Sequence, residues 1–302
     1  MLVNQRTVAE IVRFEGKGLH TGTFSRITIL PAPADSGIVF VRTDLETPVK
    51  INALAENVTS TARSTTISYG DVSVVTIEHI MSALTGLGID NAIIEVEGLE
   101  IPILDGSAKP YVKAIKAAEQ DAPRRYVEIP ETVEIKDEQS GSFVRIEPAD
   151  SFSASITVDF SSKVLGVQTA SYDEQTDYAA EIAVCRTFCF FHEIEFLFKN
   201  NLIKGGDADN AIVIVEHPVT DEQLSAIAGL VGKPKINVTH EGYLDNLTLH
   251  FPNECGRHKL LDLIGDIRLV GGFPKAKITA FKPGHGINTT AAKAVRKLVN
   301  NI

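Results

Sequence analysis

Strand-like apolar runs dominate the first half of the chain, a pattern typical of β-structure. They predict strands at Arg26–Leu30, Gly37–Val41, Val72–Ile77 and Ala92–Val96. A helix is predicted to begin near Glu78 and to run to Leu87, because the glycine that follows is a common helix terminator. Another helix is predicted over Ala108–Glu119, where Pro110 suits the first turn.

The second half repeats this theme of strands and helices. Strands are predicted at Tyr126–Ile129, Ser142–Ile146, Ser153–Phe160 and Ala211–Val215. Helices are predicted at Tyr178–Val184, Glu193–Asn201, Asp221–Val231, Arg257–Val270 and Thr290–Asn300. The long segment 216–256 should hold a helix of its own and a strand-like stretch near Leu247–Phe251. Asp121–Arg125 interrupts the pattern, so we predict a boundary there between two domains, 1–123 and 124–302.

Two short sequence similarities between the halves indicate an internal duplication. Asp90–Ile94 resembles Asp209–Val213, and His79–Gly86 resembles His258–Gly265. Each match is short, but together they favour two related α+β halves, each of which places one histidine at the start of a helix. A site between two such halves would draw one group from each.

Composition restricts the class of protein more than its activity. The 302 residues suffice for one large domain or two ordinary ones, and 44% hydrophobic with 23% charged residues is normal for a soluble protein. A formal net charge of −10 argues against a nucleic-acid partner, although a few well-placed lysines could still bind phosphates. There is no membrane-spanning run, no signal-like N-terminus and no paired cysteine framework. We therefore expect a cytoplasmic protein without a transmembrane segment.

The segment Arg257–Asp266 carries the strongest local signal for chemistry. Residues four apart share one face of a helix, so His258 and Asp262 could point together at one ion, with Asp266 one turn further along. Imidazole and carboxylate groups are both good zinc ligands. The same spacing also fits an ordinary helix that has a solvated polar face and leucines inside.

Glu78 and His79 stand at a predicted strand-to-helix junction. A catalytic zinc site typically has three protein ligands and a water, so His79 could be the third ligand and Glu78 could take a proton from that water. Adjacent helical residues normally diverge, so both can reach one metal only where the junction is irregular. A capping glutamate beside a partly buried histidine is the alternative interpretation.

Glycine and proline flank His285 in the stretch Phe281–Asn288, which predicts a shaped loop that presents the histidine. Such a histidine could be an electrophile or general acid, or lie in an ordinary turn. Upstream, five phenylalanines crowd into Phe188–Phe198 and could line a passage for an acyl chain, or simply pack a core. The three cysteines do not complete a four-ligand set, so we interpret them as structural thiols.

Together these motifs closely resemble those of the UDP-3-O-acyl-N-acetylglucosamine deacetylases, and the matches run through nearly the whole chain. The matching segments are Gly16–Gly22, Thr76–His79, Gly86–Asn91, Ile101–Ser107, Arg186–Phe188, His258–Asp266 and Gly284–His285. Any one of them is weak, whereas their order and spacing are highly specific. The resemblance implies two similar α+β domains, each a β-sheet packed on helices, with the helix layers facing each other around the active site.

The resemblance also implies chemical roles for the residues at the matching positions. His79, His258 and Asp262 would bind Zn²⁺, although Fe²⁺ could occupy the same ligands. Glu78 would be the general base, and Thr187 would be a further donor to the oxyanion.

The remaining implied roles concern acid catalysis and substrate binding. His285, held by Asp266, would be the positively charged partner that stabilises the oxyanion or protonates the leaving amine. Lys259 and Phe188 would contact the sugar. By a looser match, the nucleotide would lie near Asp159, Phe160 and Lys282, and the acyl passage would be lined by Phe190, Ile194 and Leu202.

The expected reaction is zinc-dependent hydrolysis of the acetamide of UDP-3-O-acyl-N-acetylglucosamine, which gives UDP-3-O-acyl-glucosamine and acetate in the committed step of lipid A biosynthesis. We expect a monomer that works near the inner membrane surface, because the substrate carries a lipid tail. The rival interpretations are another zinc amidohydrolase and a non-catalytic binding protein. Two departures accompany the resemblance: the segment 216–256 is longer than in the family, and some relatives continue into a fused acyl-carrier-protein dehydratase domain.

Overall fold

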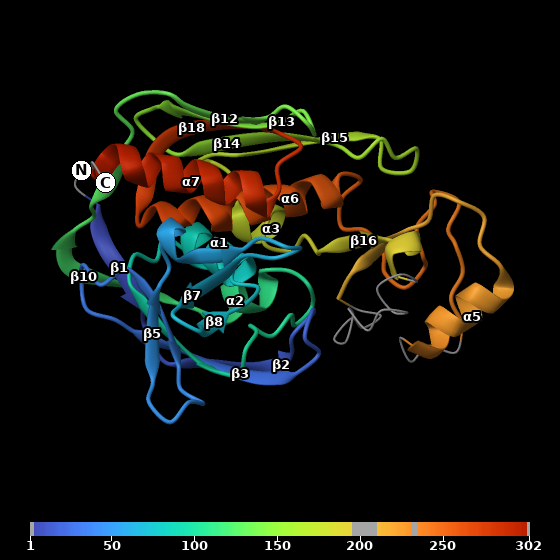
Figure 1. Ribbon diagram of the computed structural model, residues 1–302, viewed down its shortest axis with the longest axis horizontal. Helices are drawn as coiled ribbons and strands as arrows, with labels where there is room; N and C mark the ends of the chain where they lie inside the picture. The colour runs from blue at the N-terminus through green and yellow to red at the C-terminus, as the bar shows by residue number, and fades with distance from the viewer. Residues whose placement is uncertain (1–2, 195–209, 231–232, 234, 301–302) are drawn as a thin grey trace.

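The computed structural model describes residues 3–194, 210–230, 233 and 235–300. Two β-sheets form the outer layers of its main body, and helices from both halves of the chain lie between them (Figure 1). The expected α+β fold of two similar domains with facing helix layers is therefore confirmed. No described helix is long and apolar enough to cross a membrane.

The first sheet comes from the N-terminal half and has the order β2-β3-β9-β4-β5. Its strands are β2 (Val12–Lys17), β3 (Phe24–Pro31), β4 (Ile38–Arg42), β5 (Val49–Asn52) and β9 (Ala92–Glu97). The central strand β9 pairs antiparallel with β3 and parallel with β4, and the two outer pairs are antiparallel hairpins. Alternate residues of β3 are buried, so one face of this sheet covers the core and the other faces solvent.

The second sheet repeats that topology with the order β12-β13-β18-β14-β15. Its strands are β12 (Val133–Asp137), β13 (Ser142–Pro148), β14 (Ser153–Asp159), β15 (Val167–Tyr172) and β18 (Phe273–Phe281), with β11 (Tyr126–Glu128) added beside β18. Here too the last strand, β18, is central, antiparallel to β13 and parallel to β14. The same order and the same directions in both sheets support the duplication inferred from the sequence.

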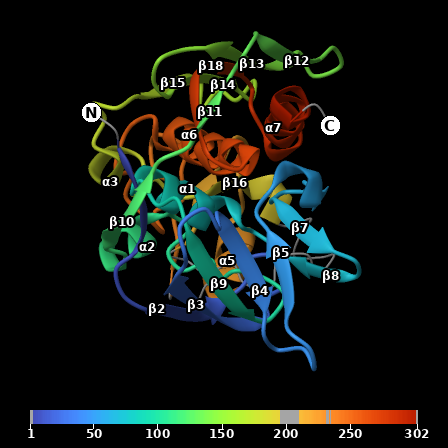
Figure 2. The same cartoon turned by 90° about the vertical axis from the view of Figure 1, so that its left-hand side faces the viewer.

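The helices that face each other are α1 (Glu78–Gly86) from the first half and α6 (Glu254–Ile267) from the second. They pack together at the centre of the molecule beside α7 (His285–Asn300), as Figure 2 shows. The close approach requires a glycine, because a Cβ atom at Gly265 would clash with the backbone carbonyl of Glu78. One hydrophobic cluster runs through both sheets and all three helices, so the halves share a core.

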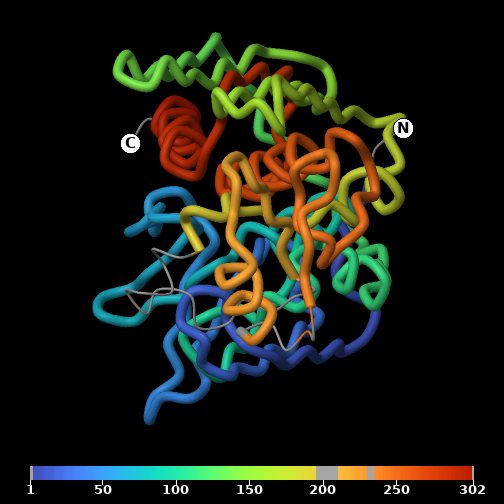
Figure 3. The backbone as a smooth tube through the Cα atoms, turned by 90° about the vertical axis from the view of Figure 1, so that its right-hand side faces the viewer, coloured from blue at the N-terminus to red at the C-terminus, as the bar shows by residue number. Residues whose placement is uncertain are grey.

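Smaller elements surround this body. They are β1 (Asn4–Val8), η1 (Ala55–Asn57), β6 (Val58–Ser60), β7 (Thr66–Tyr69), β8 (Val72–Val74), α2 (Lys109–Ala114), β10 (Ala117–Pro123), α3 (Tyr178–Glu181) and η2 (Arg268–Val270). A separate lobe carries the parallel pair β16 (Phe188–Phe190) and β17 (Ile212–Ile214) with α5 (Asp221–Leu230). This lobe extends from the main body in Figure 1 and faces the viewer in Figure 3. It has a small hydrophobic core of its own.

Several predicted elements differ from the structure. The helix predicted over Ala108–Glu119 is only α2, because the chain from Ala117 pairs antiparallel with β1 as β10. The segment Asp121–Arg125 therefore begins inside a strand, and the division at residue 123 stays a prediction. No strand forms at Leu247–Phe251, where the chain is irregular.

Other elements match more closely. Helix α5 confirms the helix predicted within 216–256, and α1 and α6 confirm the two that carry the histidines. Most of the helix predicted at Glu193–Asn201 falls outside the described residues. The sequence similarity between Asp90–Ile94 and Asp209–Val213 does not correspond to equivalent strands, because the counterpart of β9 in the second sheet is β18 and not β17.

Candidate active site

The junction that leads into α1 is irregular. Thr76 adopts a φ of 63°, a left-handed conformation that a β-branched residue rarely takes. Its hydroxyl donates to Glu100 Oε1 at 2.8 Å, and Glu100 is completely buried, so a fixed partner maintains the strained turn. Glu78 and His79 then occupy the first turn of α1, both buried, and both line the same pocket.

Helix α6 brings two more polar groups to this pocket. His258 and Asp262 lie one turn apart on one face, as their spacing predicts, and both are buried. Asp262 Oδ1 lies 3.7 Å from His79 Nε2 and 3.5 Å from His258 Nε2. The ligand atoms of all three residues lie within 4.8 Å of one another, which is close enough to hold one metal ion.

The hydrogen bonds around the three residues fit a metal. Asp262 Oδ1 is buried and has no hydrogen-bond partner, although buried carboxylate oxygens are rarely left without one. His258 Nδ1 lies 3.1 Å from the carbonyl oxygen of Cys185, so Nδ1 must carry the proton and Nε2 is left with a lone pair. Burial lowers the pKa of His79 to about 3 and also lowers that of His258, so both rings are neutral and could serve as metal ligands.

Lys259 contacts the other oxygen of the aspartate. Its Nζ lies 2.7 Å from Asp262 Oδ2. Burial raises the pKa of the Asp262 carboxyl, but Lys259 and His258 more than offset this and hold that pKa well below its usual range. Burial likewise lowers the pKa of Lys259, and Asp262 outweighs it, so the pair is ionised and one oxygen remains available.

Glu78 stands beside the three candidate ligands. Its Oε2 accepts a hydrogen bond of 3.0 Å from the backbone N–H of Thr65, which fixes the carboxyl group. Burial raises the pKa of Glu78 to about 7, although the charge of His285 opposes that rise. A carboxyl group with this pKa can gain or lose a proton at neutral pH.

His285 faces Glu78 across the pocket, with 3.9 Å between Nε2 and Glu78 Oε1. Its Nδ1 lies 2.9 Å from Asp266 Oδ2, and that carboxylate also accepts from the Thr65 hydroxyl and the Asn288 amide. Burial lowers the pKa of His285, but Asp266 and Glu78 outweigh it and raise the pKa to about 9. The predicted loop is wrong in one respect, because His285 is the first residue of α7.

A pocket of about 440 Å³ joins these groups to the lobe. It is lined by the following residues proposed from the sequence: Glu78, His79, Phe160, Thr187, Phe188, Phe190, His258, Lys259, Asp262 and His285. Phe160 is 43% exposed, and its ring lies 5.6 Å from that of Phe188 and 5.8 Å from that of Phe190. The group of candidate metal ligands therefore opens onto an aromatic wall.

Other predicted site residues lie further out. Asp159 Oδ2 and Lys282 Nζ form an ion pair of 3.4 Å. Asp159 ends β14 just before Phe160, and Lys282 follows the end of β18, the strand that pairs with β14. Ile194 packs against the core of the lobe rather than the pocket. Asp266 lies behind His285, and Leu202 lies outside the described residues.

Sequence reasoning missed several groups at the site. Thr65 connects to both Glu78 and Asp266, and only its place in a run of serines and threonines could have suggested it. His20 lines the pocket with a buried Nε2 that has no partner, and burial lowers its pKa. It stands within the matching segment Gly16–Gly22, which was the available signal. Arg63 and Glu193 form a 3.1 Å ion pair at the pocket's edge.

Comparison with known proteins agrees with this geometry. The family model for UDP-3-O-acyl N-acetylglycosamine deacetylase (LpxC) matches residues 5–228 and 225–297. The chain belongs to this family. The deacetylase of this name from Thioalkalivibrio sulfidiphilus is 38% identical over 99% of the chain and 90% of its own length, and that from Teredinibacter turnerae is 40% identical over 98% and 91%.

Relatives with a second activity in their name match as well. The bifunctional enzyme LpxC/FabZ of Porphyromonas gingivalis is 45% identical over 97% of the chain. The present chain spans 64% of that relative's length and 65% of the length of the corresponding protein from Bacteroides thetaiotaomicron. Family membership therefore rests on nearly the whole of this chain but on only part of these longer relatives.

Proposed function

We propose that the protein is a metal-dependent deacetylase that hydrolyses the acetamide of UDP-3-O-acyl-N-acetylglucosamine, a step of lipid A biosynthesis. The observation that carries the proposal is the buried group of His79, His258 and Asp262, whose Oδ1 has no protein partner. Glu78 and His285 flank that group. The raised pKa of Glu78, about 7, leaves its carboxyl group partly ionised at neutral pH, and the raised pKa of His285, about 9, keeps its ring charged. The names of the relatives supply the substrate.

Two neutral imidazoles and one carboxylate suit zinc, and ferrous iron accepts the same ligands. Zinc is our proposal for this protein. When bound, such an ion supplies Lewis-acid chemistry, because it lowers the pKa of water and polarises a carbonyl oxygen. The remaining steps belong to the side chains around it.

Glu78 is proposed as the general base. With a pKa of about 7 it is partly ionised at neutral pH, and it can take a proton from the water that attacks the acetamide carbon. The backbone N–H of Thr65 holds Oε2, which leaves Oε1 directed toward the reacting centre and His285. General bases of this kind contribute about 10²–10⁴-fold in rate.

His285 is proposed to stabilise the negative charge that develops on the amide oxygen. Its pKa of about 9 keeps the ring charged at neutral pH, and Asp266 fixes its orientation through Nδ1. The Thr187 hydroxyl also lines the pocket and can donate to the same oxygen. Either the protonated Glu78 or His285 then donates the proton to the amine nitrogen as its bond to the acetyl carbon breaks and acetate departs. The two groups lie 3.9 Å apart, too far for direct transfer between them, so each is a separate candidate for the acid.

The pocket wall is proposed to bind the rest of the substrate. Lys259 and Phe188 lie beside the metal group, where the sugar would lie. The exposed ring of Phe160, with the nearby Asp159–Lys282 pair, offers a stacking surface and charges for the nucleotide. Phe190 continues the apolar wall toward the lobe, where we place the acyl chain.

We further propose that residues 1–123 and 124–302 are the two domains, that the enzyme acts as a monomer, and that it works in the cytoplasm near the inner membrane surface. The shared core between the sheets supports a single catalytic body. A lipid-bearing substrate supports the location at a membrane surface.

Removal and return of the metal tests the proposal. The protein would be stripped with a chelator, and acetate release from UDP-3-O-acyl-N-acetylglucosamine would be followed while zinc is added and bound metal is measured directly. We expect activity to vanish and to return near one equivalent of zinc. Activity indifferent to chelation would remove the metal from the mechanism. Tight metal binding without acetate release would retain the site and reject the substrate.

A further inference from the structure

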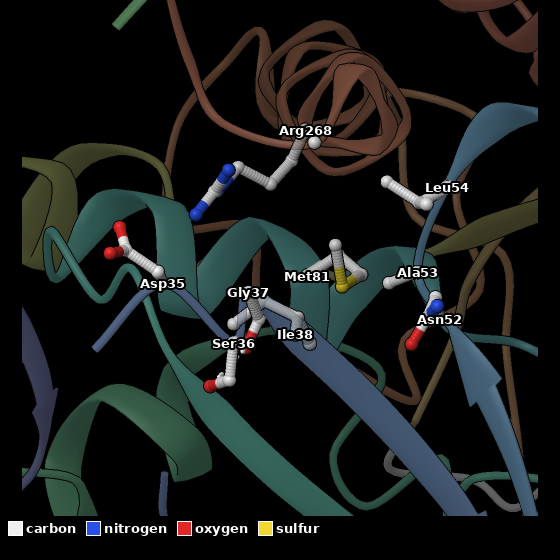
Figure 4. Close-up of a pocket in the computed structure, with 10 residues that line it drawn as sticks. Asp35, Ser36, Gly37, Ile38, Asn52, Ala53, Leu54, Met81 and Arg268 are labelled. Atoms are coloured by element: carbon white, nitrogen blue, oxygen red, sulfur yellow. Dashed lines mark hydrogen bonds between the residues drawn. The ribbon is translucent and has the colours of Figure 1, made fainter. Parts of the chain in front are cut away.

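A second cavity lies away from the active site, between the first sheet and the helix layer. It has a volume of about 190 Å³, opens to solvent, and is lined by the loop before β4, the end of β5, α1 and the η2 turn. Figure 4 shows Arg268 extending from η2 above the cavity, with Ser36, Gly37 and Ile38 below it and Met81 behind. The proposed reaction uses none of these residues.

Arg268 is the unusual group in this cavity. Its side chain is only 4% exposed, and burial lowers its pKa to about 10. Its Nη2 donates to the carbonyl oxygens of Ile89 and Asp90, while its Nε is buried without a hydrogen-bond partner. Within the described residues Arg268 forms no ion pair, because the nearby Asp90 carboxylate is held by Arg124 instead.

A buried guanidinium without a directly paired anion is costly, although the charge of the nearby Asp90 offsets part of that cost. Buried charges are normally paired, because removing a charge from water without a partner carries a large desolvation penalty. The ring of Phe273 lies 4.4 Å from the Arg268 guanidinium and compensates in part, but Arg124 stacks on the same ring at 4.1 Å and adds a like charge. A guanidinium that lines an open cavity under these conditions is prepared for an anionic ligand.

The rest of the lining defines what kind of anion fits. Ile38, Ala53, Leu54 and Met81 supply apolar walls. Asp35 also lines the cavity, on the side toward which the Arg268 side chain extends in Figure 4, and its carboxylate is held by Gln5 and Arg125. Asp35 would repel a doubly charged phosphate more strongly than a singly charged carboxylate, and a carboxylate that pairs with Arg268 can leave an uncharged tail against the apolar residues.

The size of the cavity limits the length of that tail. An apolar cavity of about 150 Å³ accepts a six-carbon molecule such as benzene. The present volume of about 190 Å³ therefore accommodates a carboxylate of about four to six carbons.

We propose that this cavity is a binding site for a short-chain organic carboxylate, whose charged group pairs with the Arg268 guanidinium and whose tail packs against Ile38, Leu54 and Met81. The site is separate from the proposed reaction and does not depend on it. Its position between the first sheet and η2 means that the ligand would contact both halves of the molecule.

The chain offers a specific probe for this site. It contains two methionines, Met1 and Met81, and Met81 lines the cavity. In the metal-loaded protein labelled with ¹³C at the methionine methyl groups, hexanoate should shift the Met81 signal in a saturable way and leave the Met1 signal unchanged. Hexanamide has the same shape without the charge and should leave both signals in place.

Two variants assign the binding to the cavity. Arg268→Met keeps the side-chain volume and removes the charge, and it should weaken hexanoate binding by about 10–100-fold, as expected for a hydrogen-bonded charge pair. Leu54→Phe keeps Arg268 and fills the cavity from its wall, so it should weaken binding even if Arg268→Met fails to fold. Both folded variants should still release acetate at the wild-type rate.

Three outcomes would overturn the proposal. Equal hexanoate binding by wild-type protein and Arg268→Met would place the ligand elsewhere, such as at the active-site metal. Binding of hexanamide as tight as that of hexanoate would remove the charge pair. A Met81 shift produced by inorganic phosphate and not by hexanoate would reject the carboxylate class. None of these results depends on whether the protein is a deacetylase.

Discussion

The two halves of the molecule have the same architecture and unequal chemistry. In each half, five strands follow the same order, and the strand that comes last in the sequence lies at the centre of the sheet. In each half, a helix that packs at the centre of the molecule comes before that strand in the chain. The first half contributes Glu78 and His79 to the pocket, whereas the second contributes His258, Asp262 and His285. A shared scaffold therefore does not mean that the site is shared equally.

The packing of the two helices explains how unequal contributions meet. Gly86 of α1 and Gly265 of α6 occupy corresponding positions, and each is in close contact, but the contacts differ. At Gly265 the neighbour is the backbone of Glu78, and at Gly86 it is the ring of Tyr178. Both contacts join the two halves, but only the one at Gly265 involves a residue of the pocket, so the position of Glu78 depends on α6.

The largest expected effect comes from removing one candidate ligand from either half. His79→Ala and His258→Ala should each lose the bound metal and all measurable acetate release, because a three-ligand site falls to two. Metal content after dialysis and acetate release would be measured together. His240→Ala, at an exposed turn, is the matched control and should retain both. Full metal affinity in either ligand variant would contradict the assignment for that half.

The next largest effect is expected from a variant that removes the proposed general base and keeps metal binding. Glu78→Gln keeps the shape and the position beside the ligands and removes the proton acceptor. It should retain stoichiometric metal and lose about 10²–10⁴-fold in turnover. Near-wild-type turnover would show that the first half supplies only a ligand.

The pH dependence of acetate release tests the role of His285, which the second half contributes. His285 has a raised pKa of about 9, so it is charged below that pH, and activity that needs the charge should fall as the pH rises through about 9. Asp266→Asn removes the stabilising negative charge, lowers the His285 pKa and should move this alkaline limb down by about one pH unit or more. The rate would be followed from pH 5 to 11, and an unmoved limb in this variant would exclude His285 as the titrating group.

The smallest expected effect concerns helix packing. Gly265→Ala introduces a methyl group against the Glu78 carbonyl and should lower the free energy of unfolding by about 1–3 kcal/mol, as overpacking does. Gly229→Ala is the matched control in α5, where a Cβ meets nothing, and it should be neutral or stabilising. Thermal unfolding of both variants would be compared. A harmless Gly265→Ala would mean that α1 and α6 can separate without cost.

Some of this arrangement could be predicted from the sequence. The spacing of His258 and Asp262 places them on one helical face, and α6 confirms it because its leucines are buried on the other sides. The similarity between His79–Gly86 and His258–Gly265 predicted the relation between the two halves. The second similarity was assigned to the wrong strand, because β18 and not β17 is the counterpart of β9.

Other features could not be predicted because their causes are distant in sequence. The Ala-rich end of the predicted helix Ala108–Glu119 becomes strand β10, since pairing with β1 outweighs local helix propensity. Thr65 reaches Asp266 across 201 positions, and a threonine in a polar run carries no local sign of that contact. His285 was assigned to a loop, although Pro283 and Gly284 before it are also consistent with the start of a helix.

The equivalence of α1 and α6 has an evolutionary consequence. His79 and His258 occupy the same position in the two helices, so in an unfused ancestor made of two identical halves they would have been one residue related by a two-fold axis. Asp262, by contrast, corresponds to Ala83, and Glu78 corresponds to Arg257. Two identical chains cannot differ at such positions. We infer that fusion of two such halves allowed a symmetric pair of histidines to acquire the proposed carboxylate ligand from one half and the proposed base from the other.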